Sequence, residues 1–170
     1  MLVGVISDTH DNLEAARRAA KMFSARGVSL VLHLGDIVAP FTLRALRDNG
    51  VERLVAVYGN NCGEKLGLRE VASKLGYEIH EWPHLLELEG RRVLMVHGIG
   101  PAEKTRMLVD SLAKSRDYDA VLYGHTHAVD NRVVGDTLVL NPGEACGCLT
   151  GKKTVAILDT RELRAEIIEI

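Results

Sequence analysis

The sequence predicts an α/β fold in which two packed β-sheets are covered by helices on their outer faces. Short apolar runs rich in β-branched residues recur along the 170 residues. In the first two thirds these runs alternate with segments whose apolar residues have helical spacing. The last third is nearly all strand-like, which favours a layered sandwich over a closed barrel. No linker, repeat or low-complexity segment is visible, so we expect one domain over residues 1–170.

The first half of the chain has a strand-helix rhythm. A strand is expected at residues 2–6 and a helix at 12–26, with Asn12 as its N-cap and Gly27 as its terminator. The apolar face of this helix carries Leu13, Ala16, Ala20 and Phe23. The next expected elements are a strand at 30–34, a helix at 41–48, a strand at 54–58 and a helix at 68–75, which ends before Gly76.

The second half is richer in strands. Strands are expected at residues 78–81, 85–88 and 93–96, followed by one more helix at 104–115. Five further strands are expected at 120–123, 129–134, 137–140, 154–158 and 164–168. This layout favours two packed sheets with helices over their outer faces.

Composition narrows the classes of partner. The chain has 21 basic and 23 acidic residues and only 4% aromatic residues, which disfavours binding to extended nucleic acid. The composition does not exclude small phosphate-bearing substrates. No apolar stretch approaches the roughly 18 residues that span a bilayer, and no basic leader precedes the first strand, so we expect a cytoplasmic protein. The sequence leaves the oligomeric state open, a homo-oligomer included.

The three cysteines do not form a disulfide framework by their number or spacing. Cys62 stands alone, and Cys146 and Cys148 are two positions apart. We interpret them as small buried or loop thiols, with a third metal or redox site as the alternative.

Polar residues of metal-ligand type follow five of the expected strands. They are Asp8, His10, Asp36, Asn60, His97, His125 and His127. In open α/β sheets, ligands bind outside the carboxyl ends of the strands, so these side chains are expected to converge. Buried charges are costly unless they are paired or coordinated, which favours a metal. Oxygen and nitrogen ligands with several imidazoles indicate Mn, Fe, Ni, Co or Zn.

Each of these segments also has a structural interpretation when it is taken alone. Asp8 and His10 suit a turn after a strand, Asp36 suits a helix cap, and His97 suits a hydrogen-bonded core histidine. The pair His125 and His127 is the sharpest signal, because two imidazoles at i and i+2 after a buried strand project from one loop. Five such coincidences at strand ends favour the metal site.

In order and spacing, these residues resemble a known signature. Asp8-Thr9-His10, Gly35-Asp36, Gly59-Asn60, His97-Gly98 and Gly124-His125-Thr126-His127 resemble the motifs of the calcineurin-like metallophosphoesterases. The short chain and Asn141-Pro142-Gly143 resemble the small YfcE-type phosphodiesterase branch of that superfamily. The resemblance implies a four-layer αββα sandwich of two mixed sheets flanked by helices.

The resemblance also implies a ligand set and a reaction. Asp8, His10, Asp36 and His127 would hold one divalent ion, and Asp36, Asn60, His97 and His125 a second, with Asp36 bridging them. Mn is favoured among the candidate ions, and Asp36, Asn60 and His97 are expected to act in catalysis. A hydroxide between the two ions would attack the phosphorus of a small phosphate ester, most directly a diester.

Three positions depart from the family pattern. Asn61 and Cys62 stand where many members have an imidazole that can protonate the leaving group, so a general acid is missing. Ile99 follows His97-Gly98, and Glu144 follows Asn141-Pro142-Gly143 in place of Ser. We expect these departures to affect substrate contacts and to leave the metal ligands intact. His33, His80 and His84 are interpreted as structural.

A protein-interaction scaffold on the same fold is the alternative function, because folds are reused and a retromer subunit is similar to this family. The complete ligand set counts against it, and slow turnover despite bound metal would favour it.

Overall fold

The structure, a computed structural model, describes residues 1–170 and contains a six-stranded sheet built mainly from the first part of the chain. Its strands are β1 (Leu2–Ile6), β2 (Leu30–His33), β3 (Leu54–Val57), β4 (Glu78–His80), β10 (Thr154–Asp159) and β11 (Arg164–Glu169). The spatial order is β11-β10-β1-β2-β3-β4. The four strands from β1 to β4 are parallel, whereas β10 pairs antiparallel with both β1 and β11.

A five-stranded sheet packs against the first one. It consists of β5 (His84–Leu88), β6 (Arg91–Met95), β7 (Ala120–Leu122), β8 (Val129–Val134) and β9 (Thr137–Pro142), in the order β5-β6-β7-β9-β8. The three central strands are parallel, and the two edge strands β5 and β8 are antiparallel to their neighbours. Both sheets are therefore mixed, as the resemblance implied.

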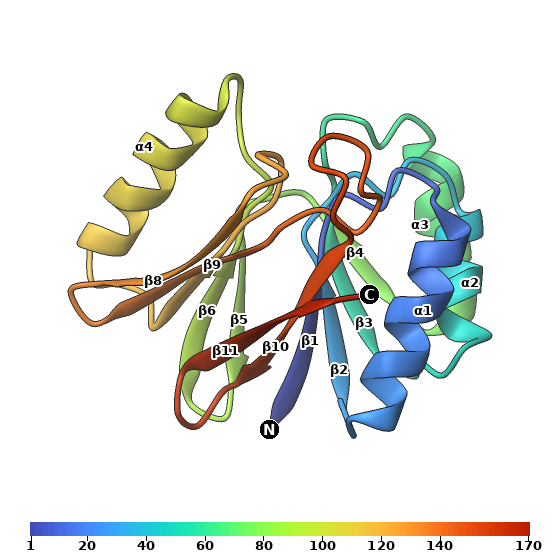
Figure 1. The fold of residues 1–170 in the computed structure, drawn as a ribbon, viewed down its shortest axis with the longest axis horizontal. Coiled ribbons are helices and arrows are strands. Elements are labelled where there is room, and N and C mark those ends of the chain that lie inside the picture. Colours follow the sequence, from blue (N-terminus) through green and yellow to red (C-terminus); the bar gives the residue numbers. More distant parts are fainter.

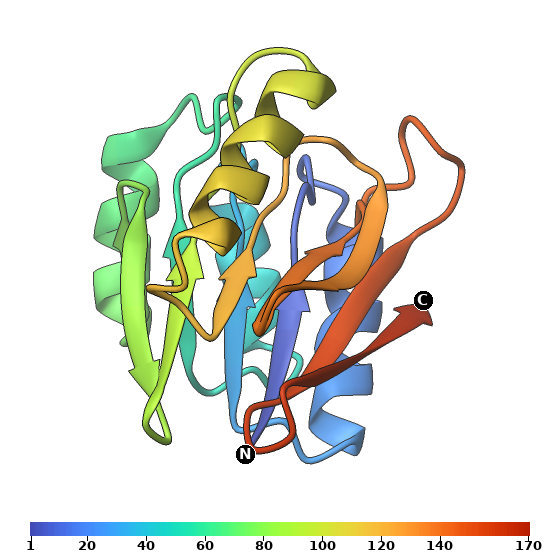
Figure 2. The same cartoon turned by 90° about the vertical axis from the view of Figure 1, so that its left-hand side faces the viewer.

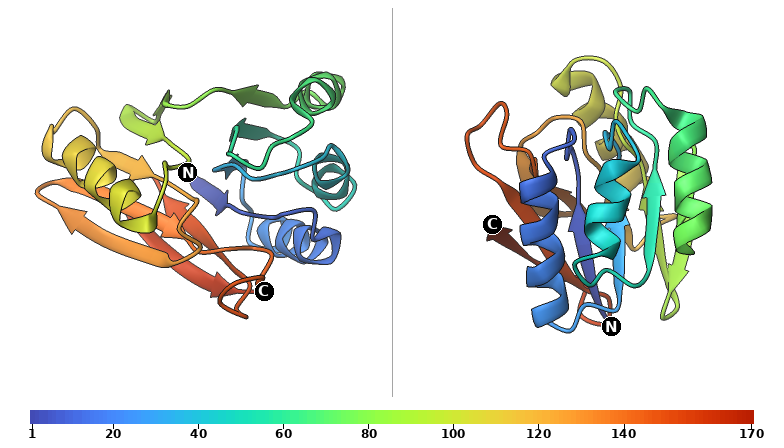
Figure 3. Two further views of the ribbon diagram at one scale, coloured as in Figure 1. Left: turned by 90° about the horizontal axis from the view of Figure 1, so that it is seen from above. Right: turned by 90° about the vertical axis from the view of Figure 1, so that its right-hand side faces the viewer.

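Four helices cover the outer faces of the two sheets. They are α1 (Leu13–Ala25), α2 (Phe41–Arg47), α3 (Lys65–Leu75) and α4 (Ala102–Lys114). Figure 1 shows α1, α2 and α3 on one side of the molecule and α4 on the other. In Figure 2, α4 crosses in front of the five-stranded sheet, and in Figure 3 the other three helices stand side by side over the six-stranded sheet. No helix combines the length and apolarity that a membrane crossing requires.

The buried apolar side chains form three clusters that match the three spaces between four layers. The largest cluster lies between α1 to α3 and the six-stranded sheet, and includes Phe23, Leu46 and Leu68. A second cluster, including Val5 and Leu122, fills the space between the sheets, and a third, including Val109, lies under α4. Alternate residues of each central strand face opposite clusters, as the period of a β-strand requires. The predicted four-layer sandwich is confirmed.

The predicted element order is confirmed, and no boundary shifts by more than three residues. Helix α3 begins at Lys65, three residues before the predicted start, because its first turn is exposed and carries no apolar periodicity. Strand β6 begins at Arg91, two residues early, where it pairs with β5 through exposed positions. Asn12 caps α1 as predicted: its side-chain oxygen accepts a hydrogen bond from the Ala15 amide at 3.1 Å.

Candidate metal centre

The structure brings all seven predicted site residues to one edge of the sandwich. Asp8 and His10 follow β1, Asp36 follows β2, and Asn60 follows β3, all in the six-stranded sheet. His97 follows β6, and His125 and His127 follow β7, in the five-stranded sheet. These strands run in parallel within each sheet, so their carboxyl ends meet at the same edge. Both sheets thus contribute to the cluster.

The backbone at the cluster is unusual. Asp8, His10, Asp36, His125 and His127 all have positive φ, between 41° and 67°. Few residues other than glycine adopt this left-handed conformation, and it persists only where surrounding contacts enforce it. Five such residues among seven predicted site residues indicate that the loops are shaped to aim these side chains.

Two glycines make room for the neighbouring side chains. A Cβ atom at Gly59 would collide with the carboxylate of Asp36, and one at Gly124 would collide with Ser7 and crowd Asp8. The glycines that precede Asn60 and His125 are therefore required by the close approach of neighbouring loops.

The first group of side chains consists of Asp8, His10, Asp36 and His127, whose potential ligand atoms all lie within 4.8 Å of one another. Nε2 of His127 is 3.4 Å from Oδ1 of Asp8, and Nε2 of His10 is 3.5 Å from Oδ2 of Asp36. Oδ1 of Asp8 and Nε2 of His10 are buried and have no hydrogen-bond partner. Buried polar atoms are nearly always paired, so two unpaired atoms facing one point fit a bound cation.

The second group consists of Asp36, Asn60, His97 and His125. Oδ1 of Asn60 is 3.0 Å from Nε2 of His97 and 2.8 Å from Nδ1 of His125. Nε2 of His97 is also 3.4 Å from Oδ1 of Asp36. Asp36 therefore lies within about 3.5 Å of side chains in both groups.

The histidines are oriented by hydrogen bonds from their other ring nitrogens. Nδ1 of His97 donates to the Leu34 carbonyl at 2.7 Å, and Nε2 of His125 donates to the Gly100 carbonyl at 2.6 Å. Nδ1 of His127 donates to the carboxylate of Glu144 at 2.7 Å. While the rings are neutral, their remaining nitrogens face the clustered oxygens as acceptors; a proton taken up by His97 turns its Nε2 into a donor to Asp36. Ring nitrogens and carboxylate oxygens that face one another as acceptors are stabilised by a positive charge between them. A histidine whose other ring nitrogen donates to an oxygen is typical of metal sites.

The pKa values of the buried acids and of His97 reflect this crowding. Burial raises the pKa of Asp8. Burial would also raise the pKa of Asp36, but hydrogen bonds from His97 and Asn61 and the charge of His97 outweigh it and hold the pKa well below its usual range. Burial lowers the pKa of His97, yet the bond to Asp36 and the charges of Asp8 and Asp36 raise it overall. The site therefore attracts positive charge, as a proton or as a metal ion.

Two supporting residues have roles that the sequence did not predict. Asn61 donates twice to Asp36, from its amide nitrogen to Oδ1 at 2.7 Å and from its side chain to Oδ2 at 2.8 Å. It therefore positions the shared carboxylate. Glu144, which was expected to affect substrate contacts, is instead fully buried behind His127. The only sequence signal for either residue was its departure from the family pattern.

Glu144 is also the anchor of the loop that follows it. Its carboxylate accepts hydrogen bonds from the backbone amides of Cys148, Leu149 and Thr150 at 2.5 to 3.0 Å. Burial would raise the pKa of Glu144, but these bonds and those from the Thr150 hydroxyl, His127 and Cys146 lower it to about 2. An ionised carboxylate therefore stands behind His127 at neutral pH.

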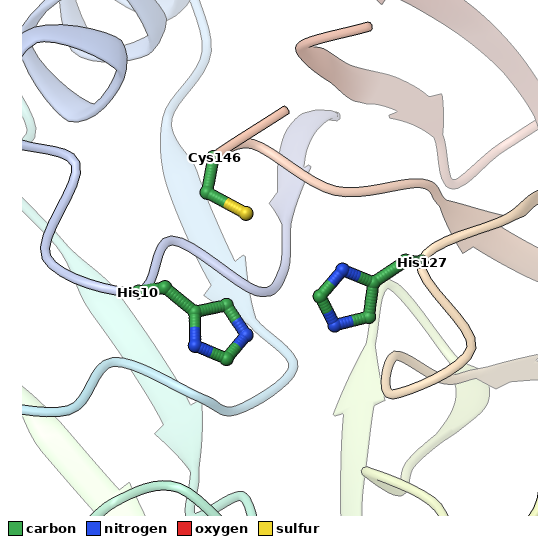
Figure 4. A group of neighbouring side chains, drawn as sticks. All are labelled: His10, His127 and Cys146. Atoms are coloured by element: carbon green, nitrogen blue, oxygen red, sulfur yellow. The ribbon is translucent and has the colours of Figure 1, made fainter. Parts of the chain in front are cut away.

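The thiol of Cys146 lies next to the first group. Its sulfur is within 4.8 Å of ligand atoms of His10 and His127, and Figure 4 shows the thiol pointing toward the space between the two rings. The sulfur donates to Glu144 at 3.1 Å, and burial raises the pKa of the thiol. All three cysteines are free, in accord with the absence of a disulfide framework in the sequence, and Cys62 is buried.

The other histidines lie outside the cluster. His33 is buried: its Nδ1 accepts from the Gly35 amide at 3.2 Å, and its Nε2 is 3.1 Å from the Thr9 hydroxyl. It therefore ties together the loops that carry Asp8 and Asp36. His80 and His84 stack on each other with ring centroids 3.8 Å apart. These contacts agree with the structural interpretation of all three.

Comparison with known proteins places this geometry in a family. The model of the family described as "calcineurin-like phosphoesterase superfamily domain" matches residues 1–163. The phosphodiesterase MJ0936 of Methanocaldococcus jannaschii is 37% identical, over 99% of this chain and 100% of that protein. The phosphodiesterase YfcE of Escherichia coli K12 is 26% identical, over 81% of this chain and 75% of that protein.

Solved structures agree with this likeness. A structure described as a novel archaeal phosphodiesterase superposes with a TM-score of 0.90 at 35% identity, covering 100% of both chains. Vps29 of Chaetomium thermophilum superposes with a TM-score of 0.73 at 17% identity, over 99% of this chain and 95% of that one, which shows the shared fold alone. With its fold, its clustered ligand-type residues and these matches, the chain belongs to the calcineurin-like phosphoesterase superfamily.

Proposed function

We propose that the protein is a phosphodiesterase that uses two divalent metal ions, with residues 1–170 acting as one metallophosphoesterase domain. The observation that carries the proposal is the orientation of His97, His125 and His127. Each has one ring nitrogen committed to an acceptor and the other turned toward the clustered oxygens. The names of the relatives MJ0936 and YfcE support a phosphodiesterase.

The seven residues divide between two ions. Asp8, His10, Asp36 and His127 would hold the first ion, and Asp36, Asn60, His97 and His125 the second. The donor set of oxygen and imidazole nitrogen suits Mn, our first choice, and also Ni, Co, Fe or Zn. When bound, two such ions would polarise the phosphoryl group and lower the pKa of water.

The protein's own residues would hold and orient the reacting groups. Asn61 and His97 keep the carboxylate of Asp36 ionised and fixed between the two groups. Asn60 and His125 line a cavity next to the second group, so a phosphate ester bound there would lie against them. On the resemblance to the family, we propose that Asp36, Asn60 and His97 act in catalysis, with His125 also against the ester.

The proposed substrate is a small phosphate ester in the cytoplasm. The formal net charge of −2 gives the chain no excess of positive charge to bind an extended nucleic acid. A diester is favoured over a monoester on the names of the relatives.

The test is hydrolysis of bis(p-nitrophenyl) phosphate and p-nitrophenyl phosphate by protein stripped with a chelator and then reloaded. We expect no hydrolysis after stripping, recovery with Mn or Ni, and faster cleavage of the diester. Full activity of the metal-free protein would contradict the proposal.

An interaction scaffold is the second candidate, supported by the fold that this chain shares with Vps29. It predicts that reloaded protein binds metal and cleaves neither ester above the rate of metal in buffer. The retained histidines favour the enzyme.

A further inference from the structure

A cavity of about 500 Å³ opens beside the second group of site residues. Asn60 and His125 form part of its lining. No residue of the first group lines it. The volume is within the range of about 300–1,000 Å³ that small-molecule sites occupy. A phosphate held at the second group would therefore direct one of its organic substituents into this cavity.

Two apolar side chains, Trp82 and Ile99, line the cavity. Trp82 is held in place because it packs both between the two sheets and under α4. Ile99 stands two residues after His97, and 54% of it is exposed. Its backbone amide is fixed at 2.9 Å from the Thr105 hydroxyl. The departure from the family pattern at Ile99 thus places a branched apolar side chain at the mouth of the site.

The lining of the cavity also includes an ion pair, Lys65 with Glu81. Nζ of Lys65 is 2.9 Å from Oε1 of Glu81 and lies 4.7 Å from the centre of the Tyr58 ring. Lys65 therefore covers one face of Tyr58, and Tyr58 is itself buried, whereas Trp82 is only partly buried and is the more accessible aromatic ring of the lining. The ion pair offers both a donor and an acceptor while adding no net charge to the cavity.

We propose that this cavity binds a planar aromatic ring carried by the phosphate ester, either the base of a nucleotide or an aryl group. A lining that combines apolar walls with a donor and an acceptor suits a flat ring with polar edges. The inference rests on the proposed function, because the phosphate must lie at the site residues for its substituent to reach Trp82. Stacking of one base on an aromatic side chain strengthens binding by about tenfold or more.

Trp82 is the single tryptophan of the chain, so its fluorescence reports directly on the cavity. Protein loaded with Mn would be titrated with adenosine monophosphate, phenyl phosphate and ribose 5-phosphate, with affinities measured by calorimetry. We expect the two ring-bearing compounds to change the emission of Trp82 and to bind at least about tenfold more tightly than ribose 5-phosphate. Tighter binding of the nucleotide than of phenyl phosphate would identify the ring as a base, and the reverse as an aryl group.

Equal affinity for ribose 5-phosphate, or an unchanged emission, would overturn the inference. Ile99→Ala should reduce the preference for ring-bearing compounds by about threefold or more while the affinity for ribose 5-phosphate stays the same. Trp82→Leu should abolish that preference. Met107→Ala is the matched control, because Met107 is 64% exposed on α4 and does not line the cavity. An Ile99→Ala protein with full ring preference would also contradict the inference.

These binding measurements separate the inference from the proposed function. Ring-dependent binding without hydrolysis of either nitrophenyl ester would leave the cavity as proposed and remove the enzymatic function. Hydrolysis with no ring preference would do the opposite.

Discussion

The two groups of site residues differ in how they are supported and in what they face. In the first group, His127 is held by the side chain of Glu144, and the whole group lies away from the cavity. In the second, His97 and His125 are held by the backbone carbonyls of Leu34 and Gly100, and Asn60 and His125 face the cavity. The difference suggests a division of labour. Under the proposed function, the first group would hold an ion, and the second would combine an ion with contact to the substrate.

Asp36 connects the two groups, so its removal gives the largest expected effect. Asp36→Ala should lose both ions and lower kcat/KM for bis(p-nitrophenyl) phosphate by at least about 10³-fold, since metal assistance contributes several kcal/mol. Elemental analysis of the purified variant and a diester assay check this. Retention of one tightly bound ion would show that the groups are independent and that Asp36 is not shared.

The second group can be tested through the leaving group. No imidazole stands at Asn61, and its side chain is committed to Asp36, so we expect no efficient general acid beside the substrate. General acids contribute about 10²–10⁴-fold, chiefly for basic leaving groups, so aryl esters should be cleaved much faster than alkyl esters. A series of diesters with leaving groups of graded pKa measures the slope.

Asn61→His tests the same point from the other direction. Histidine has an ordinary pKa of about 6.5 and can donate a proton near neutral pH, so it should flatten that slope. It also removes the side-chain bond to Asp36, so rates on aryl esters should fall. A shallow slope in the unmodified protein would mean that another group supplies the proton.

The first group can be weakened alone through Glu144. Glu144→Ala should lower the affinity for the ion at the first group by about 10–100-fold, because Nδ1 of His127 loses its acceptor. The loop that follows should also loosen, because Cys148, Leu149 and Thr150 lose theirs. Metal titration followed by calorimetry measures the affinity, and Glu144→Gln, which keeps an acceptor oxygen, should lose less. Equal losses for both ions would contradict the separation of the groups.

His84 belongs to neither group and gives the smallest expected effect. It stacks on His80 at the start of β5 and forms no hydrogen bond or ion pair with the site residues. His84→Ala should change kcat/KM by less than about twofold, since surface and peripheral substitutions rarely act at a distant site. A loss comparable to that of Asp36→Ala would show that the site has been placed wrongly.

Most of the fold could be predicted from the sequence because the apolar positions that define its pattern are the ones that the fold buries. Every predicted strand and helix is present, and the alternation of buried residues in the central strands carries the three-cluster core. The first turn of α3 was missed because Lys65 and Leu66 are exposed, which leaves no periodic signal there.

The convergence of the seven site residues was also predictable, since it follows from strands that end at one edge. Their supports were not, because a carbonyl such as that of Leu34 or Gly100 is present in every residue and only the fold decides where it points. Glu144 is 17 residues after His127, and no local pattern relates the two. Asn61 was recognised as a departure from the family pattern, but its two hydrogen bonds to Asp36 depend on the close approach of two loops.

The most direct test of the account is the number of metal ions that the intact chain binds. Chelator-treated protein titrated with Mn should take up two equivalents per chain, and His127→Ala should take up one with near-normal affinity at the second group. Elemental analysis after desalting provides an independent count. A single equivalent in the unmodified protein, or none, would contradict the two-ion site on which the proposed function depends.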